Sequence, residues 1–100
     1  MASARDVYQR LKDASLGVVV AHLHDHQRWR DVHSGLVAVE IDGWIVTLNK
    51  EAGALDYCAG CLLPDGQQLD SRAWAGRGTD PLELLSVWER ARLEQTLAQL

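Results

Sequence analysis

The chain has 100 residues, of which 47% are hydrophobic and 24% charged, and this composition is typical of one globular domain spanning residues 1–100. The net charge of −4 and the scattered basic residues argue against direct binding to nucleic acid, which relies on clustered lysine and arginine. No apolar stretch has the length of a signal peptide or a membrane span, so we expect a cytoplasmic protein without a membrane partner.

The N-terminal segment has the pattern of a short amphipathic helix that ends at Gly17. Ser3 followed by Asp6 resembles a capping box, in which each residue satisfies a backbone group of the other. Apolar side chains then recur at helical spacing on one face, at Ala4, Val7, Tyr8, Leu11 and Ala14. We expect this face to lie on a β-sheet.

A strand is expected from Val18 onward, because three consecutive valines favour β-structure. Alternation along this strand places five residues on one face: Val18, Val20, His22, His24 and His26. Two interpretations of the histidines stay open at this point. They are either a row of metal ligands or the solvated side chains of an exposed sheet edge. Residues 25–35 then read as a loop that Trp29 anchors.

A β-hairpin is the clearest pattern in the chain. Two apolar segments within residues 36–49 flank Asp42-Gly43, the favoured pair for a two-residue type I′ turn. This turn predicts the cross-strand pairs Ile41–Trp44, Val39–Val46 and Val37–Leu48, which would form one continuous apolar face.

Residues 49–66 predict a turn, a third strand and a second turn. The segment 49–54 reads as the first turn, and residues 55–58 return as the strand. Pro64-Asp65-Gly66 then has the composition of a tight turn, after which residues 67–69 can form a short edge strand. Residues 70–78 read as a surface loop anchored by Trp74.

The C-terminal segment predicts one helix from Asp80, with Asp80 as N-cap and Pro81 at the first helical position. Its apolar residues fall on two opposite faces. One face is expected to pack on the core, with residues Leu84, Val87, Trp88, Ala91 and Ala98. The opposite face is the expected partner-binding surface, with residues Leu82, Leu85, Leu93, Leu97 and Leu100. Cover by the chain itself is the alternative for this second face.

These elements together predict an α+β fold. It consists of an antiparallel meander of three to five strands, with one N-terminal and one C-terminal helix packed on one face of the sheet. The sequence contains no nucleophile elbow and no glycine-rich phosphate loop, so we do not expect an enzyme.

The combination of the hairpin, the cysteine segment and the C-terminal helix resembles a family of small bacterial proteins, familiar mainly from pseudomonads. The likeness spans Ala4 to Leu100, and the matching residues are Asp42, Gly43, Trp44, Leu55, Asp56, Tyr57, Cys58, Cys61, Pro64, Asp65, Gly66, Asp80, Pro81, Trp88 and Glu89. The family is a domain of unknown function, so the resemblance implies no activity. The histidine-rich run at residues 22–26 is not part of this pattern.

Three interpretations of Cys58 and Cys61 remain open. The two thiolates could be half of a zinc site, which His22 and His24 would complete most readily among the histidines that also include His26 and His33. They could instead be a redox pair, although no helix N-terminus follows them to lower a thiol pKa. The third interpretation is two small buried side chains without chemistry, which needs no cofactor.

The leading functional hypothesis is a non-enzymatic interaction or regulatory protein that binds a protein partner, or itself as a homodimer, through an apolar helix face. One alternative is an acidic inhibitor, of the anti-defence type that phages encode, which blocks a complex that handles nucleic acid. Another alternative is a zinc-stabilised or thiol-redox protein built on the Cys-x-x-Cys motif.

Overall fold

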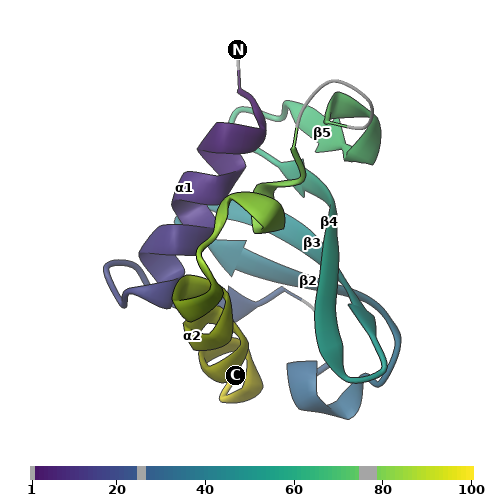
Figure 1. The fold of residues 1–100 in the computed structure, drawn as a ribbon. Helices are drawn as coiled ribbons and strands as arrows, with labels where there is room; N and C mark the ends of the chain where they lie inside the picture. Colours follow the sequence, from purple (N-terminus) through teal and green to yellow (C-terminus); the bar gives the residue numbers. More distant parts are fainter. Residues whose placement is uncertain (1, 25–26, 75–78) are drawn as a thin grey trace.

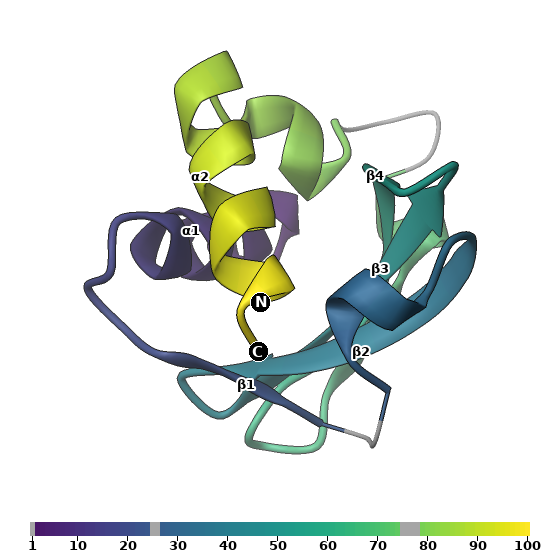
Figure 2. The same cartoon turned by 90° about the horizontal axis from the view of Figure 1, so that it is seen from below.

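The computed structural model describes residues 2–24, 27–74 and 79–100. Its five strands form one antiparallel sheet in the order β1-β2-β3-β4-β5, and both helices lie on the same face of this sheet (Figures 1 and 2). The predicted α+β fold is therefore confirmed. The strands are β1 (Ala21–Leu23), β2 (Gly35–Ile41), β3 (Trp44–Glu51), β4 (Ala54–Leu62) and β5 (Gln68–Asp70); the helices are α1 (Ala4–Ser15) and α2 (Val87–Ala98), and the 3-10 turns are η1 (Trp29–Asp31), η2 (Ser71–Ala73) and η3 (Pro81–Leu84).

The hairpin between β2 and β3 has the predicted register. Ile41 pairs with Trp44, and the other two predicted pairs, Val39–Val46 and Val37–Leu48, are also present. Asp42 and Gly43 adopt φ angles of 53° and 80°, as a type I′ turn requires. A second turn of the same kind, at Ala52-Gly53 with φ angles of 52° and 80°, joins β3 to β4, so β3 is two residues longer than expected.

Helix α1 also forms as expected. The Asp6 carboxylate accepts a hydrogen bond from the Ser3 backbone N–H at 2.8 Å, which completes the capping box. Val7, Leu11 and Ala14 are buried against the sheet. Gly17 has a φ of 77° just after the helix, so it ends α1 in the left-handed conformation that glycine tolerates best.

The strand expected from Val18 begins later and is shorter. Only Ala21–Leu23 pair with β2, while Val18 and Val20 are each 69% exposed in the connection from α1. His26, the third residue of the predicted histidine row, lies outside the described residues. The tryptophan anchors predicted for the two loops are both buried, Trp29 within η1 and Trp74 directly after η2.

Strand β4 contains two extra residues that its neighbour β3 does not match. Leu48 pairs with Cys58 while the next pair joins Thr47 to Gly60, so Ala59 is a β-bulge. A second shift lies between the Asn49–Tyr57 and Lys50–Leu55 pairs, where Asp56 is extra. In a regular strand successive residues lie on opposite faces, so Cys58 would lie on the face opposite Leu55 and Cys61. The two bulges bring all three to the core face, where they are buried.

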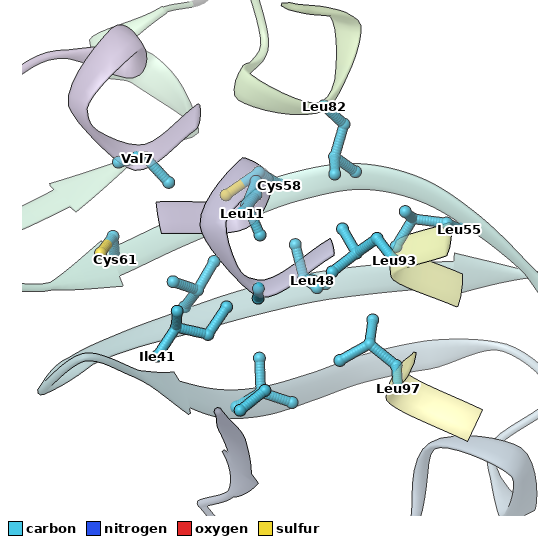
Figure 3. Packing of buried hydrophobic residues seen from close by; sticks show 14 of the residues in the cluster. Val7, Leu11, Ile41, Leu48, Leu55, Cys58, Cys61, Leu82, Leu93 and Leu97 are labelled. Atoms are coloured by element: carbon cyan, nitrogen blue, oxygen red, sulfur yellow. The ribbon is translucent and has the colours of Figure 1, made fainter. Parts of the chain in front are cut away.

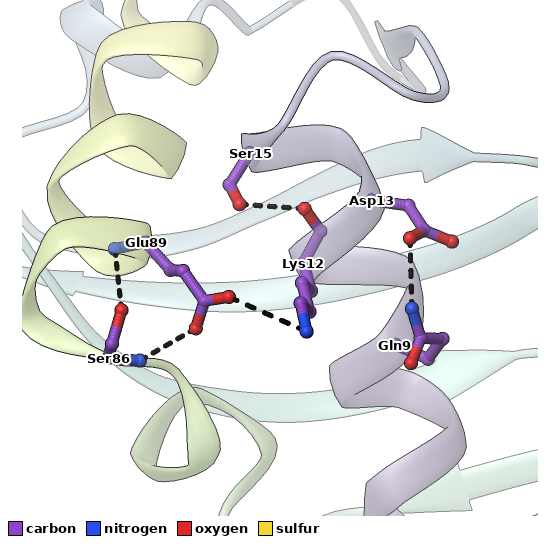
Figure 4. Close-up of polar contacts among 6 residues, drawn as sticks. All are labelled: Gln9, Lys12, Asp13, Ser15, Ser86 and Glu89. Carbon is purple, nitrogen blue, oxygen red and sulfur yellow. Dashed lines mark hydrogen bonds and ion pairs between the residues drawn. The ribbon is translucent and has the colours of Figure 1, made fainter.

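The expected single C-terminal helix is two elements instead of one. The 3-10 turn η3 ends at Leu84, and Leu85 has an extended backbone with φ −73° and ψ 142°. Ser86 then caps a new helix: its hydroxyl accepts from the Glu89 N–H at 3.0 Å, and Glu89 accepts from the Ser86 N–H at 2.8 Å (Figure 4). The Ser-x-x-Glu spacing that signals this cap is visible in the sequence.

The hydrophobic core lies between the sheet and the two helices. Leu11 of α1 and Cys58 of β4 both belong to the buried cluster, and Figure 3 shows Leu93 and Leu97 of α2 pointing toward the same sheet face. Lys12 of α1 and Glu89 of α2 form a partly buried ion pair at 3.9 Å that links the two helices (Figure 4). Among the described residues, no helix has both the length and the apolar character needed to cross a membrane.

Candidate functional site

The two cysteines are part of the hydrophobic core. Cys58 is 0% exposed and Cys61 is 4% exposed, and neither forms a disulfide. Burial, together with the nearby Asp80 carboxylate, raises the pKa of Cys58 to about 12, and burial raises the pKa of Cys61 to about 11. Both groups are therefore thiols at neutral pH, whereas nucleophilic and metal-binding cysteines are thiolates.

This burial predicts slow thiol labelling in the folded protein. At pH 8 a thiol of pKa 12 is ionised in only about one molecule in ten thousand, and the surrounding core blocks the reagent as well. We expect Cys58 and Cys61 to react with a thiol reagent only after denaturant is added. A cysteine placed at the exposed Ala91 is the internal reference and should react at once. Rapid labelling of the wild-type chain without denaturant would contradict this placement.

The predicted zinc ligands do not come together. His22 pairs with Glu40 on the sheet face opposite the core, because its neighbours Ala21 and Leu23 pair with the core residues Ile41 and Val39. His24 is exposed and follows on the same outer face. His22 and His24 thus lie on the face opposite the cysteines, and β2 and β3 separate β1 from β4. The described residues contain no group of three or more candidate ligands placed to hold a metal ion.

The leucines expected to bind a partner are core residues. Leu82, Leu93 and Leu97 are at most 1% exposed, Leu85 is 8% exposed, and Leu100 packs partly buried against the core. The assignment of the two faces is therefore corrected: Trp88, expected in the core, is 59% exposed. The physical reason is the break at Leu85, since a single helical period cannot be applied across an extended residue.

A surface suited to binding is the face of the sheet that the helices leave uncovered, which we call the open face. The apolar and uncharged residues of this face that line a shallow hollow include Leu36, Ala38, Ile45, Thr47, Ala59 and Leu62, and Glu40 lies beside Ile45 on the same face. The hollow has a volume of about 470 Å³. Leu36 is 54% exposed because it lies on the open face of β2, whereas its neighbour Val37 lies on the core face. His24 and Asp70 lie at the rim, so an apolar centre is bordered by polar groups, as in many protein interfaces.

Lys50 is a buried cation that sequence reasoning did not single out. It follows Val46 and Leu48 on the core side of β3 and is only 3% exposed. Its Nζ donates to the Trp29 carbonyl oxygen at 2.5 Å and lies 4.6 Å from the centroid of the Trp29 ring. Burial lowers the pKa of Lys50, while Glu94 and Asp31 act in the opposite direction. Lys50 therefore holds η1 against the sheet. Counting every second residue of β3 from Val46 would have placed Lys50 on the core face from the sequence alone.

The outer edge of β4 is covered by side chains. The short strand β5 pairs only with Gly60–Leu62, which leaves the first part of β4 without a neighbouring strand. Arg90 of α2 donates to the Leu55 carbonyl oxygen at 2.6 Å. The Asp80 carboxylate accepts from the Cys58 N–H at 3.0 Å and from the Leu82 N–H at 2.9 Å. Asp80 thus caps η3 and closes the edge of β4 simultaneously.

The comparisons with known proteins agree with the resemblance noted in the sequence. No curated protein and no solved structure shows significant similarity to the chain. Residues 1–99 match one family across almost their whole length. The chain therefore belongs to the family described as Domain of unknown function (DUF7693).

Proposed function

We propose that this chain is a small non-enzymatic binding protein that recognises a protein partner through the open face of its sheet. The observation that supports the proposal is the hollow of about 470 Å³ that Leu36, Ala38 and Ile45 help to line, on the face without helices (Figure 2). Contiguous apolar surface of this kind in a soluble protein commonly marks an interaction site. The polar rim at His24 and Asp70 would set the orientation of the partner.

Other features also support a binding role over a catalytic one. The cysteines are protonated core residues, and Lys50 is held by Trp29. Cys58, Cys61 and Lys50, whose pKa values are shifted, thus serve the packing or the hydrogen bonds of the fold. Catalytic groups with shifted pKa values usually face a cleft. The leading hypothesis from the sequence, binding through an apolar surface, is retained, and the surface moves from the C-terminal helix to the sheet.

Replacing Leu36 with glutamate tests the proposal. The new carboxylate would stand in the middle of the apolar surface, so we expect loss of the partner captured from the native host by the wild-type chain. The folded state should persist because Leu36 is more than half exposed. Capture by the wild-type chain should change little with salt, since the contact is apolar.

The matched control is Val87→Glu, which introduces the same charge at a side chain 89% exposed on α2. It should retain the partner. Circular dichroism of both variants would verify that each is folded. Loss of the partner in Val87→Glu together with retention in Leu36→Glu would place the binding surface on the helical side and overturn the proposal.

A further inference from the structure

The two edges of the sheet differ in how they are protected. At the β4 edge, charged side chains occupy the backbone groups: Arg90 binds the Leu55 carbonyl, and Glu94 accepts from the Leu55 N–H at 3.4 Å. At β5 the edge carries Asp70, whose carboxylate forms an ion pair with Arg72 at 2.9 Å. Charges and occupied backbone groups prevent another strand from adding to an edge. This side of the sheet is therefore closed to strand pairing.

The β1 edge has the opposite character. β1 stands at the end of the strand order and pairs with β2. The His24 N–H donates to the Ala38 carbonyl oxygen at 3.2 Å, which fixes the alternation of hydrogen bonds along the strand. The backbone groups of Ala21 and Leu23 consequently point away from β2, along the outer edge of the sheet. They are placed to pair with a further strand.

The sequence at this edge lacks the charged and proline residues that would discourage pairing, although β1 itself is only three residues long. Residues 14–24 contain no aspartate, glutamate, lysine, arginine or proline, although the whole chain carries a net charge of −4. Val18 and Val20 are both 69% exposed beside the edge. A second copy can therefore approach here without bringing like formal charges together, and apolar side chains on the two copies match each other.

The core also extends to this edge. A hollow of about 300 Å³ beside β1 is lined by Val19, Ala21 and Leu100, which pack with the hydrophobic core, and on its α2 side by the polar residues Arg92, Thr96 and Gln99. An additional strand along β1 would cover the opening of this hollow. Pairing would thus satisfy backbone hydrogen bonds and remove apolar surface from water at the same site.

We propose that two copies of the chain associate through β1, with the two β1 strands antiparallel about a twofold axis. The backbone groups of Ala21 and Leu23 form the new hydrogen bonds, and Val20 of each copy is buried at the interface. The result is one continuous antiparallel sheet across the dimer, with the two open faces on the same side. Such an interface is closed, since both copies use the same edge and the opposite edge, in the part of the chain that the structure describes, is protected.

The proposal predicts the mass of the wild-type chain and of one variant. Wild type should show a mass near twice the 11.1 kDa of one chain at micromolar concentrations, measured by light scattering. Val20→Lys places a charge beside the edge, so its dissociation constant should rise at least about tenfold, and at a concentration near the wild-type dissociation constant it should have the mass of a single chain. Val87→Lys, the matched change on α2, should remain dimeric.

Hydrogen exchange of the wild-type chain provides a second readout that does not depend on the folding of a variant. The amide hydrogens of Ala21 and Leu23 should become more protected as the concentration rises. A wild-type chain that is monomeric throughout the range overturns the proposal. A dimer that persists in folded Val20→Lys, or whose Ala21 and Leu23 amides exchange equally at all concentrations, overturns it too. None of these outcomes affects the proposal for the open face, which concerns a different partner.

Discussion

Replacing Leu93 and Leu97 together with glutamate is expected to leave the chain unfolded. Both leucines are 0% exposed and point from α2 into the core (Figure 3). A buried carboxylate without a partner costs several kilocalories per mole even after relaxation of its surroundings. Two of them, added to the lost leucine packing, approach the ~5–15 kcal/mol that stabilises a domain of this size. Circular dichroism and the dispersion of amide resonances would measure the loss.

The matched control carries the same two charges on the opposite side of α2. Val87 is 89% exposed and Ala91 is also exposed, so Val87→Glu with Ala91→Glu should keep the native spectrum. The control separates burial from any effect of negative charge on the helix. If the Leu93 and Leu97 double variant stayed folded and lost only an interaction, these leucines would belong to a binding surface after all.

Asp80→Ala is expected to destabilise the chain by about 2–4 kcal/mol. The carboxylate accepts hydrogen bonds from the backbone N–H groups of Cys58 and Leu82, and alanine would leave both without this acceptor. The variant removes the cap of η3 and opens the edge of β4 in one step. Chemical denaturation would measure the change in the free energy of unfolding.

Asp80→Asn is the control for charge, and it adds a pH dependence. Asparagine keeps one acceptor oxygen, so its loss of stability should be smaller than that of alanine. Burial is the main cause that raises the pKa of Asp80 above 3.8 in the folded chain. The folded state therefore takes up a proton before the unfolded state as the pH falls, which stabilises it.

The stability advantage of wild type over Asp80→Asn should thus grow as the pH falls from 7 toward 4. Below the unfolded-state pKa of 3.8 both states carry the proton, so the advantage should then stay constant. An advantage that shrinks over this interval would show that the hydrogen bonds to Cys58 and Leu82 dominate the ionisation of Asp80.

The parts of the fold set by local rules could be predicted from the sequence. Asp42-Gly43 tolerates positive φ, and this turn fixes the register of β2 and β3. The cap at Ser3 and the apolar stripe of α1 are equally local. Each of these features depends on residues within about one turn or one strand pair of each other, so no knowledge of distant contacts was needed.

The candidate site depended on long-range contacts and could not be placed. The side of α2 that faces the core is decided by the extended residue Leu85 and the new cap at Ser86. The separation of His22 and His24 from the cysteines depends on which strand faces the helices and on the bulges of β4. The sequence did predict that both helices pack on one sheet face, but the residues of the open face could not be listed before the strand order and the bulges of β4 were known.

The bulge at Ala59 also changes the interpretation of the Cys-x-x-Cys motif in this chain. In a zinc knuckle or a redox turn, the interval of three brings two thiols together around one centre. Here the interval of three is the two-residue repeat of a β-strand plus the one bulged residue. Cys58 pairs with Leu48 of β3, and Cys61 pairs with Val46, two residues away. A related chain without the bulge would read Cys-x-Cys and could keep the same two core positions. The three-residue interval between the cysteines therefore follows from the β-bulge, and the motif by itself does not indicate a reactive or metal-binding site.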